Sequence, residues 1–343
     1  MVQSVIIKRK IGQPLQDILG QKSYSKIGVL VDVNTENLCL PLIQSEIPNF
    51  ELLRVEAGEK FKTLETCQNI WEQLTHKGFD RHSILIVLGG GVLGDMGGFC
   101  ASTFKRGIDF ILVPTTLLSQ VDASVGGKLG IDFMGFKNHI GLFREPTATL
   151  ISPNFLTTLP VRELRSGYAE VIKHSLIADK GKWNSINRKG LDEQNWEDLI
   201  DFSFQFKSGI AETDPYEGGI RKILNFGHTI GHAVESCCLT TDSPLFHGEA
   251  IAVGMITESH ISFQKGMLSE ADLGEVTNYI KGVFGKEKNL PTTEAILEWV
   301  TQDKKNKGNR VLMALLEGVG HAVWDVEVNE NEIRNSLDYY RSL

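Results

Sequence analysis

Short apolar runs alternate with helix-like patterns in the first half of this 343-residue chain. Residues 26–32 (KIGVLVD) and 83–91 (SILIVLGGG) are rich in β-branched residues and end in polar or glycine residues, as buried parallel strands do. Between them, apolar residues recur at helical spacing over residues 62–79. Residues 108–116 (IDFILVPTT) resemble a third strand. This alternation predicts a parallel α/β sheet.

Helical patterns dominate after residue 154. The stretch 159–177 (LPVRELRSGYAEVIKHSLI) predicts a long helix, with Pro160 suited to its first turn. Residues 310–328 predict a β-hairpin, which is followed by a short final helix. We therefore expect an α/β domain over residues 1–153 and a mainly helical domain over residues 154–343.

Composition excludes several classes of protein. The chain carries 35 Lys and Arg against 43 Asp and Glu, a net charge of −8, and its isoelectric point is about 5.7. Nucleic-acid binding needs a basic face, so we expect no such partner. No apolar run approaches the ~18 residues that span a bilayer, and no leader pattern opens the chain, so we expect no membrane partner. Five cysteines without C-x-x-C spacing indicate reduced thiols and a cytoplasmic protein.

A cluster of glycines follows the second predicted strand. The segment GGGVLGDMGG (89–98) satisfies G-x-G-x-x-G through Gly89, Gly91 and Gly94. Glycines there allow a tight turn and let backbone N–H groups meet a pyrophosphate at a helix N-terminus. The fingerprint usually follows the first strand, however, and has an acidic residue ~20 positions later, whereas Asp109 comes sooner. A dinucleotide turn and a simple packing turn both remain open from this spacing.

Histidines and a carboxylate form a second group. His228 and His232 lie four residues apart on one face of a predicted helix, His247 follows, and Glu170 lies on an earlier helix. Histidine and carboxylate from separate elements suit a catalytic zinc, which takes three protein ligands and keeps one position open. Spacing alone nominates His228 and His232 as the ligand pair, with a structural histidine pair as the alternative.

Cations gather beside these motifs on an acidic chain. Two short glycine-bearing stretches, 120–128 and 137–143, are expected to be loops. The basic residues near the motifs are Arg106, Lys128, Lys137, Lys173, Lys207 and Arg221. Each could be an ordinary surface cation, but the set together indicates an anionic small substrate such as a phosphate or carboxylate.

Six ordered stretches give the sequence its resemblance to a known family, the 3-dehydroquinate synthases, which are sugar-phosphate cyclases. The stretches are GGGVLGD (89–95), RGIDFILVPTTLLSQVDASVGGK (106–128), KNHIGLF (137–143), LTTLPVRELRSGYAEVIKH (156–174), RKILNFGHTIGHA (221–233) and HGEA (247–250). The resemblance extends from about Val29 to Val328. One departure is Phe136, which precedes the Lys-Asn pair where family members usually have glycine.

The resemblance implies an N-terminal Rossmann-like NAD domain and a C-terminal, mainly helical domain that holds zinc, or Co²⁺ in its place. It implies Glu170, His228 and His247 as the metal ligands, which moves His232 to the substrate side and replaces the pair chosen from spacing. It also implies a homodimer in which Arg106 reaches the neighbouring active site.

The resemblance further implies two sets of contact residues. The implied NAD contacts are Asp32, Asn34, Glu59, Lys62, Gly90, Gly91, Val92, Asp95, Thr115, Thr116, Lys137, Phe155 and Thr158. The implied substrate-site residues are Arg106, Asp122, Lys128, Asn138, Lys173, Lys207, Glu217, Arg221, Asn225, His232 and Lys304, chosen over Lys305.

The activity implied is the conversion of 3-deoxy-D-arabino-heptulosonate 7-phosphate to 3-dehydroquinate and phosphate, the second step of the shikimate pathway to aromatic amino acids. NAD would be oxidised and re-reduced within one turnover, so the reaction is redox-neutral. Three other hypotheses remain open: another sugar-phosphate cyclase, a zinc- and NAD-dependent polyol dehydrogenase of the glycerol dehydrogenase type, and a non-catalytic NAD-binding module.

Overall fold

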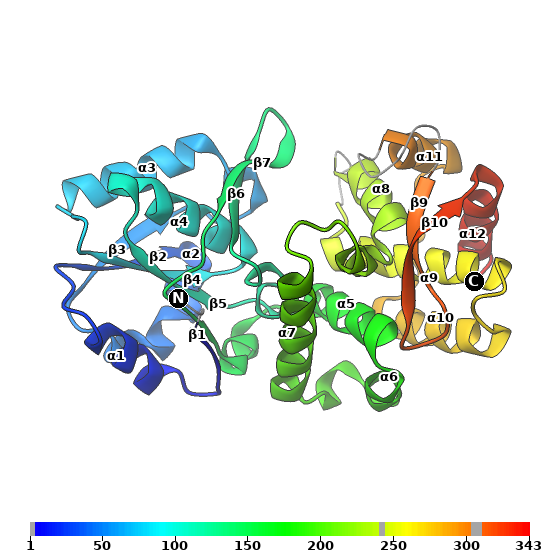
Figure 1. Ribbon diagram of the computed structural model, residues 1–343, viewed down its shortest axis with the longest axis horizontal. Coiled ribbons are helices and arrows are strands. Elements are labelled where there is room, and N and C mark those ends of the chain that lie inside the picture. Colours follow the sequence, from blue (N-terminus) through cyan, green and yellow to red (C-terminus); the bar gives the residue numbers. More distant parts are fainter. Residues whose placement is uncertain (1–3, 240–243, 303–310) are drawn as a thin grey trace. The chain divides into compact units, whose positions relative to one another are not determined.

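The chain packs into two compact units (Figure 1). The computed structural model describes residues 4–239, 244–302 and 311–343. Unit 1 comprises Met1–Leu164 and Trp196–Phe204, and unit 2 comprises Arg165–Asn195 and Gln205–Leu343. The boundary predicted between residues 153 and 154 falls within unit 1, because packing assigns the start of the following helix to that unit. The division into NAD and zinc domains at that boundary stays a prediction.

Unit 1 is built on a six-stranded parallel sheet. In spatial order its strands are β1 (Ser4–Ile7), β8 (Ala148–Ile151), β5 (Asp109–Pro114), β4 (Ile84–Gly89), β2 (Ile27–Asp32) and β3 (Phe50–Val55). The parallel sheet and the strands β2, β4 and β5 confirm the sequence prediction. Strands β1, β3 and β8 were not predicted from the sequence. Two of these have only four residues, and β3 is an edge strand with a mixed polar pattern.

Helices cover both faces of this sheet (Figure 1). They are α1 (Gly12–Gly20), α2 (Val33–Leu38), α3 (Leu64–His76) and α4 (Gly91–Thr103). Alternate residues of β2 serve the two cores: Leu30 packs with α3 and α4, whereas Val29 and Val31 pack with α1. This arrangement buries the strands on both sides, which is why they read as continuous apolar runs.

The predicted loop over residues 137–143 is wrong. The structure forms an antiparallel hairpin there from β6 (Lys128–Phe133) and β7 (Phe136–Phe143). Gly130 pairs with Gly141, and a Cβ on Gly130 would lie 2.8 Å from the Ile140 carbonyl oxygen, so the two backbones meet where neither residue has a side chain. Residues 120–128 form a π-helical turn, Ser119–Ala123, and a further turn before β6 begins. Glycines in both strands hide the apolar alternation that would predict the hairpin.

Unit 2 is mainly helical, as predicted. Its helices are α5 (Val161–Ala178), α6 (Lys180–Ile186), α7 (Trp196–Thr213), α8 (His228–Cys238), α9 (His247–Gln264), α10 (Glu270–Phe284), α11 (Thr293–Gln302) and α12 (Glu330–Ser342). The first turn of α5 and the first half of α7, Trp196–Phe204, are counted with unit 1. The predicted hairpin is present as β9 (Val311–Leu316) and β10 (Ala322–Val328). Helix α9 is buried along most of its length and packs against α8, α10 and α12. Among the described helices, none is long and apolar enough to cross a membrane.

Candidate active site

A hollow in unit 1 lies at the junction of β4 and α4. Strand β4 ends at Gly89, Gly90 caps the helix without a side chain, and α4 begins at Gly91. The first N–H groups of a helix lack intrahelical partners, so this end can receive an anion. The hollow encloses about 380 Å³, part of it open to solvent. Its lining includes Gly90, Gly91, Gly94, Asp95, Ser119, Ala123, Ser124 and Lys128.

The glycines of this junction hold the backbone close to its neighbours. A Cβ on Gly90 would lie 3.0 Å from Thr116 Cγ2, and one on Gly91 would lie 3.2 Å from the Cβ of Ala123. A Cβ on Gly94 would meet no atom within 4 Å, so this helical position faces open space. The hollow therefore suits a ligand that approaches the backbone itself, as a dinucleotide does.

Lys62 connects this hollow to the β6–β7 hairpin. Its ammonium group is buried and donates hydrogen bonds to Asp95 Oδ2 and Asn138 Oδ1, both at 2.6 Å. Burial raises the pKa of Asp95, although the Lys62 ammonium opposes that rise. Asn138 has a φ of +51° and its N–H donates to Asp132. The contact fixes a predicted substrate residue beside two predicted NAD residues.

The other predicted NAD residues lie at several places in unit 1. Asp32 ends β2 and accepts hydrogen bonds from the N–H groups of Asn34 and Thr35 at 2.9 Å, so its carboxylate caps α2. The Nζ atom of Lys137 lies 4.0 Å from Glu59 Oε1. Thr115, Thr116 and Val92 adjoin the hollow along the chain.

Two predicted NAD residues lie in the short helix Pro153–Thr158. The side chain of Phe155 is buried in the core formed with α1, and Thr158 donates a hydrogen bond to the Phe155 carbonyl. The structure therefore gives Phe155 a packing role. An apolar residue at this place in the sequence is compatible with either packing or a cofactor contact, so the sequence alone does not separate the two.

Asp122 lies in the π-helical turn Ser119–Ala123, and Lys128 opens β6 and lines the hollow. Arg106 is exposed in the turn Phe104–Arg106, where its φ is +69°. These predicted substrate residues all belong to unit 1.

In unit 2, α5 supplies a buried carboxylate. Glu170 is 1% exposed, and Lys173, one turn later and 2% exposed, contacts its Oε2 atom. The Oε1 atom lies 3.4 Å from His228 Nε2 and 3.6 Å from His247 Nε2. Among the described residues, no donor makes a well-aligned hydrogen bond to either carboxylate oxygen. Lys173 supplies a cation at Oε2, and the two imidazole nitrogens that face Oε1 make that side of the carboxylate suited to a metal ion.

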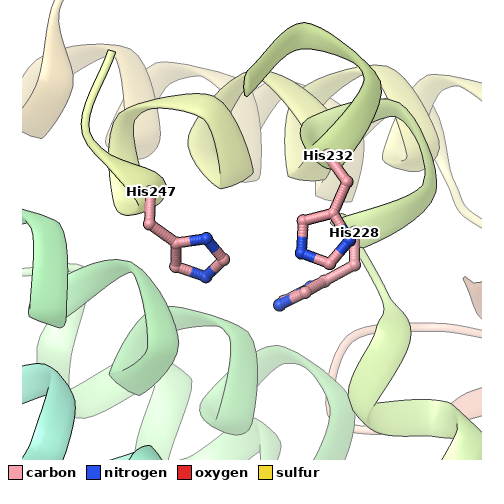
Figure 2. Close-up of side chains that lie close together, drawn as sticks. All are labelled: His228, His232 and His247. Atoms are coloured by element: carbon pink, nitrogen blue, oxygen red, sulfur yellow. The ribbon is translucent and has the colours of Figure 1, made fainter. Parts of the chain in front are cut away.

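Three imidazoles from two helices converge (Figure 2), and two of them, His228 and His247, face the Glu170 carboxylate. His228 is the first residue of α8, His232 lies one turn later, and His247 is the first residue of α9. One ring nitrogen of each lies within 4.8 Å of the others. His228 Nδ1 lies 3.0 Å from the Phe226 carbonyl oxygen, which leaves Nε2 to face Glu170.

Burial and neighbouring charges shift the pKa values of these groups in different directions. Burial lowers the pKa of His228 to about 4, with the Lys173 ammonium adding to the effect. Burial alone would lower the pKa of His247 as well, but contacts with Glu170 and Glu235 raise it to about 9. Burial alone would raise the pKa of Glu170, but the Lys173 ammonium holds it well below the usual value. The carboxylate is thus ionised, as a metal ligand must be.

A compact loop before α8 carries more of the predicted residues. The Asp214 carboxylate accepts hydrogen bonds from the N–H groups of Gly218 at 2.9 Å, Gly219 at 2.7 Å and Arg221 at 3.1 Å. Arg221 is 5% exposed and donates to the Pro215 carbonyl.

Asn225 donates to Glu217 Oε1 at 2.7 Å, and Glu217 has a φ of +60°. Lys207 is buried on α7, and Lys304 lies outside the described residues. Asp214 was not predicted, and the available signal was the Gly-Gly pair that begins four residues later.

Comparisons with known proteins cover nearly the whole chain. Residues 52–166 match the family model for the N-terminal part of 3-dehydroquinate synthase, and residues 167–323 match the model for its C-terminal part. A 3-dehydroquinate synthase of Parabacteroides distasonis is 40% identical over 99% of this chain and 98% of its own length. One from a Sulfurovum species is 38% identical, over 94% and 93%.

Solved structures share the fold. The 2-epi-5-epi-valiolone synthase of Streptomyces hygroscopicus, solved with NAD⁺ and Zn²⁺ bound, aligns with a TM-score of 0.89 at 26% identity, over 100% of this chain and 97% of that one. A 2-deoxy-scyllo-inosose synthase aligns with a TM-score of 0.85 at 23% identity, over 98% and 96%. A probable glycerol dehydrogenase of Sinorhizobium meliloti aligns at 0.63 and 14% identity, over 99% and 96%.

Proposed function

The chain belongs to the 3-dehydroquinate synthase family, and we propose that it converts 3-deoxy-D-arabino-heptulosonate 7-phosphate to 3-dehydroquinate and phosphate. This is the second step of the shikimate pathway. The observation that carries the proposal within the structure is the buried Glu170 carboxylate facing the Nε2 atoms of His228 and His247. A polar constellation of this kind, buried beside basic residues, suits an enzyme better than a non-catalytic NAD-binding module.

NAD and zinc are the cofactors. The hollow at the N-terminus of α4 fits a pyrophosphate, because glycines expose its backbone N–H groups. Two imidazoles and one carboxylate are a ligand set that zinc prefers, and a fourth position stays open for substrate. Held there, zinc would supply Lewis-acid polarisation of a substrate hydroxyl, and NAD would supply reversible hydride transfer with the carbon that bears this hydroxyl.

We assign Glu170, His228 and His247 as the metal ligands, with His232 on the substrate side. Both Nε2 atoms face Glu170, whereas His232 is the most exposed of the three imidazoles. Lys173 contacts Glu170 directly and so keeps the buried carboxylate ionised.

The basic and amide side chains hold the anionic ends of the substrate. We assign this role to Arg106, Lys128, Asn138, Lys173, Lys207, Arg221, Asn225, His232 and Lys304, with Asp122 and Glu217 orienting them. Three of the cations, Lys173, Lys207 and Arg221, are buried, and a buried cation binds an anion more strongly than an exposed one. They would hold the phosphate so that one of its oxygens takes the proton from the neighbouring carbon as the carbon–oxygen bond breaks. After return of the hydride and opening of the sugar ring, the aldol step needs the open-chain intermediate held in a folded shape with water excluded.

We also propose that the enzyme is a cytoplasmic homodimer. All five cysteines are free thiols, which supports a reducing compartment. Arg106 stands exposed in a tight turn with a left-handed backbone, where it can extend beyond its own subunit. In the dimer it would complete the active site of the neighbour.

The test is incubation of the purified protein with the heptulosonate phosphate, Zn²⁺ and a trace of NAD. We expect release of one phosphate for each dehydroquinate formed, without accumulation of NADH. Sedoheptulose 7-phosphate and glucose 6-phosphate serve as comparison substrates, and turnover of either in place of the heptulosonate would favour another cyclase. Stoichiometric NADH from glycerol would instead favour a polyol dehydrogenase, whose fold this chain shares.

A further inference from the structure

One face of α8 carries three polar side chains in succession. His228, His232 and Glu235 stand at positions i, i+4 and i+7, so they follow one another along the same side of the helix. Helices α8 and α9 pack against each other, and His247 opens α9. Figure 2 shows the imidazole of His247 directed toward His228 and His232 on this face of α8. Glu235, the last of the three along α8, is neither a proposed metal ligand nor a proposed substrate contact.

Glu235 contacts the far side of the His247 ring. Its Oε2 atom lies 3.1 Å from His247 Nδ1, and its side chain is only 12% exposed. An ionised carboxylate can only accept a hydrogen bond, so the proton of the contact resides on Nδ1. A proton on Nδ1 leaves Nε2 as the ring atom that can ligate a metal ion, on the side where Glu170 Oε1 lies 3.6 Å away.

His228 is oriented in the same sense by a different acceptor. Its Nδ1 atom faces the carbonyl oxygen of Phe226, two residues earlier in the chain, at 3.0 Å. His247 is the first residue of its helix, where the capping contact at Phe246 N–H comes from Glu249 and leaves the imidazole free of the cap. The orientation of His247 thus depends on a side chain from another helix.

We propose that Glu235 is a positioning residue for the metal centre, which fixes the tautomer and the ring plane of His247 and makes its Nε2 atom a better ligand. The inference rests on the ligand set of the proposed function. Carboxylates behind ligating imidazoles raise ligand basicity, and their loss typically weakens metal affinity by about 10–100-fold.

The test is the zinc affinity of Glu235→Gln and Glu235→Ala, measured by competition with a chelator on metal-free full-length protein. Gln keeps the shape and one acceptor oxygen, so we expect a loss near the lower end of that range, about tenfold, and a loss of up to about 100-fold for Ala. We also expect a changed visible absorption spectrum of the Co²⁺-loaded variants, since the ligand field follows the orientation of the ring. Thermal unfolding of the metal-free variants should match wild type, which separates positioning from a merely structural role.

The matched control is Glu317→Gln. Glu317 Oε2 lies 3.4 Å from His321 Nε2 in the same unit, but this histidine–carboxylate pair is exposed. Its removal should leave the zinc affinity and the Co²⁺ spectrum unchanged. Wild-type zinc affinity in both Glu235 variants would overturn the inference.

A second variant separates this inference from the proposed function. Glu170→Gln removes a proposed ligand and should lower zinc affinity beyond either Glu235 variant. If Glu170→Gln loses zinc while the Glu235 variants retain it, only the positioning role is wrong. If Glu170→Gln binds zinc as wild type does, the ligand set itself is wrong.

Discussion

Glycines of one helix serve different purposes, which only their surroundings reveal. In α4, a Cβ on Gly97 would lie 2.8 Å from side-chain atoms of Leu30 and Val87, so that glycine lets the helix approach the sheet. Gly94 lies one turn earlier and meets no neighbour within 4 Å. Both belong to the same glycine-rich segment, and the sequence does not distinguish them. We infer that Gly97 is needed for packing and Gly94 for ligand space.

We therefore predict that Gly94→Leu weakens NAD binding without unfolding the protein. The new side chain would extend into the hollow, and we expect the dissociation constant to rise at least about tenfold, or about 1.4 kcal/mol. Isothermal titration with NAD and thermal unfolding would measure the two effects. Gly282→Leu on α10, where a Cβ also meets no neighbour, is the control and should leave NAD binding intact. Unchanged NAD affinity in Gly94→Leu would show that the nucleotide binds elsewhere.

At the scale of elements, the junction of α8 and α9 places two of the three proposed ligands. Gly227 precedes α8 with a φ of +78°. A Cβ on Gly254 of α9 would lie 1.9 Å from the carbonyl oxygen of Gly227. The buried Glu258 carboxylate of α9 accepts hydrogen bonds from the N–H groups of Gly227 at 2.6 Å and Ile230 at 3.0 Å. A side chain of one helix thus caps the other. The close approach and the cap together hold His228 at a fixed distance from α9.

Gly254→Ala tests this junction. The methyl group would collide with backbone, which cannot move aside as a side chain can, so we expect a loss of at least about 1–3 kcal/mol in the free energy of unfolding. Urea unfolding would measure it. Gly274→Ala on α10 is the matched control: a Cβ there meets nothing within 4 Å, and alanine should stabilise the helix by up to about 1 kcal/mol. Equal stability of the two variants would contradict the close approach.

At the scale of the whole molecule, the two units divide the chemistry. The residues that line the nucleotide hollow belong to unit 1, whereas the proposed metal ligands belong to unit 2. The proposed dimer adds a further level, because Arg106 would then serve the site of the neighbouring subunit. A variant of Arg106 and a variant of a metal ligand would accordingly damage different sites of a mixed dimer.

We predict that two inactive variants restore activity when mixed. In a dimer of one Arg106→Ala and one Glu170→Ala subunit, the first subunit keeps its metal ligands and receives Arg106 from the second. Random exchange after partial denaturation should recover about a quarter of wild-type activity, since half the dimers are mixed and each has one complete site. Mass spectrometry would confirm the mixed dimers, and each variant exchanged with itself is the control. Mixed dimers without activity would place Arg106 in its own subunit's site.

Some features followed from local patterns. The apolar runs of β2, β4 and β5 and the helical periodicity of α3 and α5 predicted those elements, because burial on both faces or on one helical face leaves a period in the sequence. The hairpin of β6 and β7 escaped prediction because the facing glycines Gly130 and Gly141 leave no such period. The ordered motifs gave the family, since together they carry far more information than any one of them.

The sequence by itself determined the parallel α/β half, the helical half, the glycine turn and the histidines, because each is encoded in residues close along the chain. Only the tertiary structure decided that His247 faces Glu170 on one side and Glu235 on the other, and that Lys62 joins Asp95 to Asn138. These contacts join residues far apart in the sequence, and their partners are selected by how helices and strands pack. Spacing shows which residues share a helix face, but packing selects what that face meets.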